Sequence, residues 1–126
     1  MDDTWKKASA ETVERFHGAV AGIVGLEVRK MFGYPAGFVG GNMAVGVFRD
    51  TLLVRLPEPE RAERLAEGWS LFEPMPGRPM REYVALPESV AADPVETRHW
   101  MERAAAYGRT LPPKAPKPRK PRAAKP

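Results

Sequence analysis

Four arginines are the residues best suited to bind an anion. Arg29, Arg55 and Arg81 fall in segments that read as β-strands, and Arg78 lies in the turn before the last of these strands. A guanidinium group can donate two parallel hydrogen bonds to one carboxylate or phosphate. If the strands are neighbours, the four side chains could line one face of a sheet and hold an anion there.

The alternative is that each arginine pairs with a nearby acid, and we favour it because the surrounding sequence is acidic. Arg29 has Glu27 two residues away and Glu82 on another expected strand as partners. In the stretch PGRPMREYV, Pro76 and Gly77 indicate a turn, so we expect Arg78 to anchor that turn and Arg81 to pair across the sheet.

Residue sets for catalysis or metal binding do not stand out. The chain has two histidines, His17 and His99, on different expected helices, and no cysteine, which excludes thiol chemistry, disulfides and cysteine-ligated zinc. None of the three serines sits in a nucleophile-elbow sequence. The glycine-rich stretch GYPAGFVGGN lacks the spacing of a phosphate loop. We therefore predict no catalytic residue, no metal and no cofactor, and a protein that is not an enzyme.

The charge of the chain is concentrated in its last 18 residues. The formal net charge is +4, yet residues 1–108 contain 13 basic and 16 acidic residues. The segment 109–126 is acid-free and holds six prolines, which predicts a disordered, extended tail. Its basic residues are Arg109 and the six that we predict to contact nucleic acid, Lys114, Lys117, Arg119, Lys120, Arg122 and Lys125.

Binding through this tail would be non-specific. No aromatic residue follows Tyr107, so stacking on bases is not available and contact would be with phosphates of DNA or RNA. The alternative is a solubilising tail without a dedicated partner, and charge alone does not decide between the two. We accordingly expect a domain over residues 1–108 followed by a tail over residues 109–126.

The spacing of apolar residues predicts an α+β fold: a mainly antiparallel β-sheet flanked by an N-terminal and a C-terminal helix, with a short helix between strands. Ser9 and other residues before position 10 can cap the first helix, and Asp93-Pro94 can begin the last one, which Gly108 should end. The expected elements in the first half are a helix over 9–24, a strand over 26–33, a loop or bulged segment over 34–42 and a hairpin over 42–57 that turns at Arg49-Asp50. A short helix over 57–68, a strand over 80–86 and a helix over 93–108 follow.

The order of these elements and several short motifs resemble one known family. KMFG, GNMAVGVF, TLLVRLP, PGRPMREYVALP and the YGRTLPPK helix end together resemble the TfoX N-terminal domain, named after the bacterial competence regulator TfoX, or Sxy. The resemblance covers roughly residues 13–114. It implies an α+β fold with a sheet flanked by helices, and it supplies no catalytic residues. The regulator also has a C-terminal helical domain, where this sequence has a basic tail.

These observations favour a non-enzymatic regulatory or interaction module. Its expected partners are DNA or RNA, bound weakly through the tail, and a protein bound by the folded body, as a monomer or a homodimer. The rival hypothesis is a small-molecule or anion-binding protein, or an enzyme, with its site between sheet and helices. Without an apolar N-terminal signal or a membrane-length apolar run, we expect a cytoplasmic location and no membrane partner.

Overall fold

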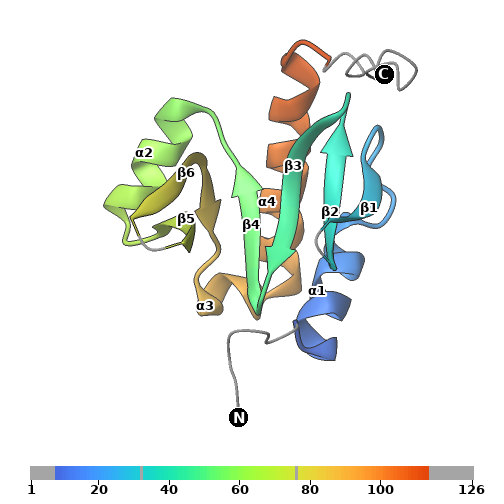
Figure 1. The fold of residues 1–126 in the computed structure, drawn as a ribbon, viewed down its shortest axis with the longest axis horizontal. Helices are drawn as coiled ribbons and strands as arrows, with labels where there is room; N and C mark the ends of the chain where they lie inside the picture. The colour runs from blue at the N-terminus through green and yellow to red at the C-terminus, as the bar shows by residue number, and fades with distance from the viewer. Residues whose placement is uncertain (1–7, 32, 76, 114–126) are drawn as a thin grey trace, which may run out of the picture.

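The computed structural model describes residues 8–31, 33–75 and 77–113, apart from the side chain of Arg78. Figure 1 shows the strands beside one another, with helices packed against them. In chain order the elements are α1 (Ala10–Val20), β1 (Glu27–Met31), β2 (Tyr34–Val39), β3 (Asn42–Phe48), β4 (Thr51–Arg55), α2 (Glu58–Ala66), β5 (Ser70–Met75), β6 (Arg78–Ala85), α3 (Glu88–Ala91) and α4 (Pro94–Thr110).

The six strands form one sheet in the order β1-β2-β3-β4-β6-β5, and all neighbouring strands are antiparallel. The hairpin of β3 and β4 turns at Arg49 and Asp50 as predicted, and Arg49 takes a positive φ of 55° there. The predicted α+β class, with flanking helices and a short helix between strands, is confirmed.

Helices α1 and α4 cover one face of the sheet. Figure 1 shows α4 behind β3 and β4, with α1 beside it, so that the opposite face of these strands has no helix over it. The main core fills the covered side, where Phe16 of α1 and Met101 of α4 are fully buried against Val45, Val54 and Val84 of the sheet. Alternate strand residues therefore point to the other, helix-free face.

Both long helices begin at side-chain caps that the sequence predicts. The Ser9 hydroxyl accepts a hydrogen bond from the Thr12 amide at 3.1 Å, and the Asp93 carboxylate accepts one from the Val95 amide at 3.0 Å. The predicted end of the last helix at Gly108 is wrong, because α4 continues to Thr110.

Gly108 instead serves helix–sheet packing. A Cβ at this position would lie 3.1 Å from the Cβ of Val39 in β2. The absence of a side chain lets α4 approach the sheet closely, which is a tertiary requirement and not a helix stop.

The segment 34–42, expected to be a loop or bulged approach, is largely the regular strand β2. Its glycine content misled the prediction, because Gly37 is needed for packing: a Cβ there would lie 2.8 Å from a methyl group of Val45. A bulge does occur between Gly37 and Phe38. Strand β5 and the short helix α3 were not anticipated. Strand β5 contains Pro74 and pairs irregularly with β6, so it lacks the regular pattern of a strand.

Candidate functional site

The helix-free face of the sheet carries a second apolar cluster. Leu53 of β4, Phe72 of β5 and Tyr83 of β6 are each at most 8% exposed, although no helix among the described residues packs over them. Met43 and Phe48 of β3 pack against this group. A sheet face that looks toward solvent normally carries polar residues, so a buried apolar cluster on this face marks it as the part of the fold to examine for binding.

The cluster surrounds a cavity of about 220 Å³ whose lining is almost wholly apolar. Methionines and aromatic rings from five strands, together with Pro74 of β5, make up most of its wall. The lining residues are Met31, Tyr34, Ala36, Met43, Gly46, Val47, Phe48, Leu53, Phe72, Pro74 and Met80.

Two small residues produce the hollow. Ala36 of β2 lies opposite Gly46 of β3, and Gly46 lies opposite Leu53 of β4. A Cβ on Gly46 would meet the Cβ of Ala36 at 3.6 Å and the sulfur of Met43 at 3.7 Å, which is ordinary van der Waals contact. A Cβ would therefore fit above Gly46 without a clash, and any larger side chain at this position would occupy the cavity.

Tyr83 and Arg55 form a polar border beside the cluster. The Tyr83 hydroxyl donates a hydrogen bond to the backbone oxygen of Met43 at 2.8 Å, and the Arg55 guanidinium lies 5.7 Å from the Tyr83 ring centre. Burial raises the pKa of Tyr83, and the positive charge of Arg55 opposes that rise. Burial is the largest single effect on Arg55 and would lower its pKa, but the hydrogen bond to Glu82 and the charge interactions with Tyr83, Glu82 and Tyr107 together raise the pKa.

The structure distributes the predicted anion-binding arginines over three strands. Arg29 is on the edge strand β1, and two strands separate it from Arg55 on β4. Arg81 is on β6, next to β4, and is exposed, and Arg78 begins β6 with a side chain outside the described part.

Two of these arginines pair locally, as the favoured alternative predicts. Arg29 lies 3.8 Å from Glu27 and its guanidinium sits 4.2 Å from the Phe38 ring centre. Arg55 donates from Nε to Glu82 at 2.7 Å. Anion binding by the four arginines stays a prediction.

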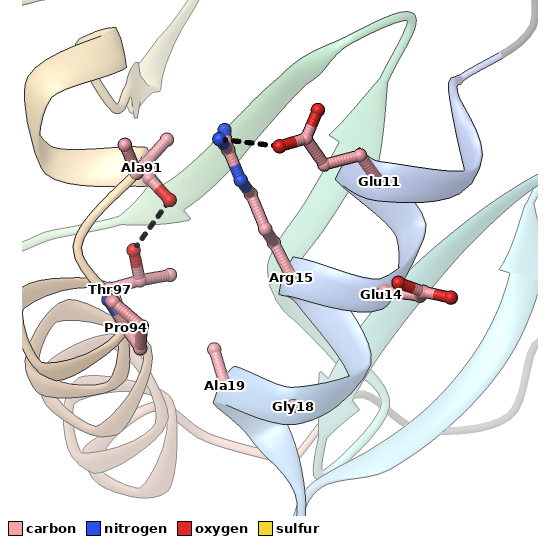
Figure 2. A pocket seen from close by; sticks show the side chains of 9 residues that line it. Glu11, Glu14, Arg15, Gly18, Ala19, Ala91, Pro94 and Thr97 are labelled. Atoms are coloured by element: carbon pink, nitrogen blue, oxygen red, sulfur yellow. Dashed lines mark hydrogen bonds and ion pairs between the residues drawn. The ribbon is translucent and has the colours of Figure 1, made fainter.

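A larger, more polar groove lies on the helical side. It measures about 440 Å³ and runs between α1 and the α3–α4 segment. Figure 2 shows Arg15 reaching from α1 toward Glu11, to which its Nη2 donates at 3.1 Å, and its Nη1 lies 3.5 Å from Glu88. The Thr97 hydroxyl donates to the Val90 backbone oxygen at 2.8 Å. These contacts connect α1 to α3 and α3 to α4, so we interpret the groove as a boundary between packed helices.

The predicted nucleic-acid contacts Lys114, Lys117, Arg119, Lys120, Arg122 and Lys125 lie outside the described residues. Arg109, the remaining basic residue of the expected tail, lies in α4 and donates a hydrogen bond to the Val24 backbone oxygen at 2.7 Å. Contacts of the folded body continue beyond 108, since Asn42 donates to the Pro112 backbone oxygen at 3.0 Å.

Two further findings concern only the part of the chain that the structure describes. There, no three His, Cys, Asp or Glu side chains come together in a group that could hold a metal ion. In the same ranges, none of the helices has the length and apolar character needed to cross a membrane.

The structure is a small α+β domain with an apolar cavity on its helix-free face. A family model, the TfoX N-terminal domain, matches residues 19–107, which is most of the chain. The chain therefore belongs to the TfoX N-terminal domain family, as its motifs indicated. No curated protein matches the chain.

Proposed function

We propose that this protein is a non-enzymatic interaction module whose helix-free sheet face binds a protein partner through one large apolar side chain. The observation that carries the proposal is the apolar cavity over Ala36 and Gly46 on a face with no covering helix. A regulatory role and a cytoplasmic location accompany this proposal as predictions.

The size and chemistry of the cavity favour a protein side chain over a cofactor. Its volume is below the roughly 300–1,000 Å³ of typical small-molecule pockets. It offers few polar groups to orient a ligand, whereas methionines adapt to differently shaped apolar groups. Arg29 is half-exposed beside Phe38, and Arg49 is exposed with its guanidinium 5.4 Å from the Phe48 ring centre. An apolar centre with arginine and aromatic residues around it is typical of interface hot spots.

Selection of random peptides displayed on phage tests this proposal. We expect the wild-type protein to enrich peptides that share a large apolar or aromatic residue. Gly46→Val should abolish their binding by filling the cavity, and Met80→Glu should weaken it by placing a charge at the rim, where Met80 is 38% exposed. Met75→Glu is the matched control, because Met75 is exposed on the neighbouring strand and does not line the cavity. Peptides that bind all four proteins equally would refute the proposal.

The second candidate function is weak nucleic-acid binding by the tail, supported by six basic residues without an acid after Pro113. Such a segment is drawn to phosphates regardless of base sequence. If all six charges contact phosphates, the logarithm of the affinity should fall with the logarithm of salt concentration at a slope of about −4 to −5.

The measurement is duplex DNA binding at several salt concentrations, with the intact chain and with a variant carrying glutamine at all six tail positions. This design keeps Arg109 and the Asn42–Pro112 contact, which belong to the folded body. Equal affinity of the two proteins for duplex DNA would show that the basic residues of the tail do not contribute to binding.

The rival small-molecule or anion-binding function has less support. Arg29 and Arg55 already contact acids, and the groove between the helices is bordered by ion-paired side chains. The apolar cavity lies on the helix-free face, whereas this hypothesis expected a site between the sheet and the helices.

A further inference from the structure

We propose that two copies of this protein associate by antiparallel pairing of their β1 strands, about a two-fold axis at Val28. This inference concerns the edge of the sheet and does not depend on the proposed role of the apolar cavity.

Strand β1 is the better of the two sheet edges for pairing. It pairs with β2 over five consecutive residues, Glu27 to Met31, without a bulge, and its outer side has no neighbouring strand among the described residues. The opposite edge, β5, contains Pro74, and its pairing with β6 shifts register twice. Proline and irregular pairing protect an edge from strand addition, and β1 has neither.

The pairing of β1 with β2 shows which backbone groups face outward. Lys30 lies opposite Pro35, which has no N–H, so this pair cannot exchange two hydrogen bonds. In an antiparallel ladder, hydrogen-bonded and non-hydrogen-bonded pairs alternate. The N–H and C=O groups of Val28 and Lys30 therefore point to the free edge, where Val28 can exchange both hydrogen bonds with its symmetry mate.

This register makes the charges of the edge complementary. With the axis at Val28, Glu27 of each copy lies opposite Arg29 of the other, and both side chains are on the helix-free face. Their side chains are 71% and 51% exposed in the single chain. An axis at Arg29 would instead place two arginines opposite each other, which is unfavourable.

Exposed apolar groups on the other face support the same arrangement. Val28 is 40% exposed, and it borders a groove formed with Val13 of α1 and Pro35 of β2. The groups that face Val28 in this groove also include His17 and Lys30. Pairing at Val28 brings the two valines together and covers part of this groove, so association removes apolar surface from water.

Sedimentation equilibrium of the intact chain, from micromolar to millimolar concentration, tests the proposal. We expect a reversible dimer. Glu27→Arg and Arg29→Glu should each weaken dimerisation by about tenfold or more, because each places like charges opposite one another twice. The double variant Glu27→Arg/Arg29→Glu should restore the wild-type dissociation constant. Glu14→Arg, an equal charge change at an exposed position of α1, should have little effect.

Thermal unfolding of each variant checks that the fold is retained, since the pair within one chain is exposed and stabilises little. A wild-type protein that stays monomeric at every concentration would overturn the proposal. The charged residues of β1 would then act to prevent strand association. The proposal would also be overturned if both single variants kept the wild-type dissociation constant. The same holds if the double variant dimerised as weakly as the single variants.

Discussion

The hydroxyl of Tyr83 in β6 donates a 2.8 Å hydrogen bond to the backbone oxygen of Met43 in β3, across the intervening strand β4. The phenol ring thereby lies over β4 and closes one side of the apolar cluster on the helix-free face. This contact joins strands that do not pair directly, and it holds Met43, a lining residue of the cavity.

Tyr83→Phe should lower the free energy of unfolding by about 1 kcal/mol, because the Met43 oxygen loses a partly buried hydrogen bond. Tyr107→Phe is the matched control, since no hydrogen bond of the Tyr107 hydroxyl occurs among the described residues. Urea unfolding of the three proteins measures the difference. Equal losses in both variants would show that the hydrogen bond contributes nothing.

The raised pKa of Tyr83 predicts a loss of stability at alkaline pH. Below about pH 10, the ordinary pKa of tyrosine, both the folded and the unfolded states hold the neutral phenol. As pH rises above that value, the unfolded state releases the proton first, so the contribution to stability is lost as pH approaches and passes the folded pKa.

Absorbance at 295 nm, recorded from pH 8 to 12, should show one tyrosine in the wild type that ionises above pH 10 and is missing from Tyr83→Phe. The stability of Tyr83→Phe should also fall less between pH 9 and pH 11. A difference titration centred at or below pH 10 would contradict the raised pKa.

Two helical glycines should respond oppositely to alanine. A Cβ on Gly18 of α1 meets nothing within 4 Å, so Gly18→Ala should stabilise the protein by about 0.5–1 kcal/mol through helix propensity. Gly108→Ala places its Cβ 3.1 Å from the Cβ of the buried Val39, which cannot rotate away, and we expect a net loss of about 1–2 kcal/mol. Thermal or urea unfolding measures both, and a stabilised Gly108→Ala would show that α4 is free to move from β2.

Most of the fold could be predicted because local signals agree with it. Ser9 and Asp93 cap helices, and Arg49-Asp50 occupies the hairpin turn. The failures fall on glycines whose reason is tertiary. Gly37 looked like a loop residue and Gly108 like a helix stop, but each makes room for a valine on another element. Spacing along one strand does not reveal such contacts.

The candidate cavity was not predicted from the sequence. Its lining comes from segments between Met31 and Met80, and the alternation of β4 alone shows only that Leu53 faces away from Leu52 and Val54. A glycine inside a strand indicates close packing or a bulge, and Gly46 is the one sequence signal that coincides with the hollow. The arginines were easier to notice, yet strand order separates Arg29 from Arg55.

The most direct test of the central claim is a titration of the isotopically labelled protein with N-acetyltryptophanamide, followed by amide chemical shifts. The proposal predicts saturable shifts concentrated at Ala36, Gly46 and Leu53, weaker shifts in Met80→Glu and unchanged shifts in Met75→Glu. A binding site on the helix-free face would be contradicted if the shifts clustered along α1 and α4. It would also be contradicted if Met80→Glu and Met75→Glu reduced the shifts equally.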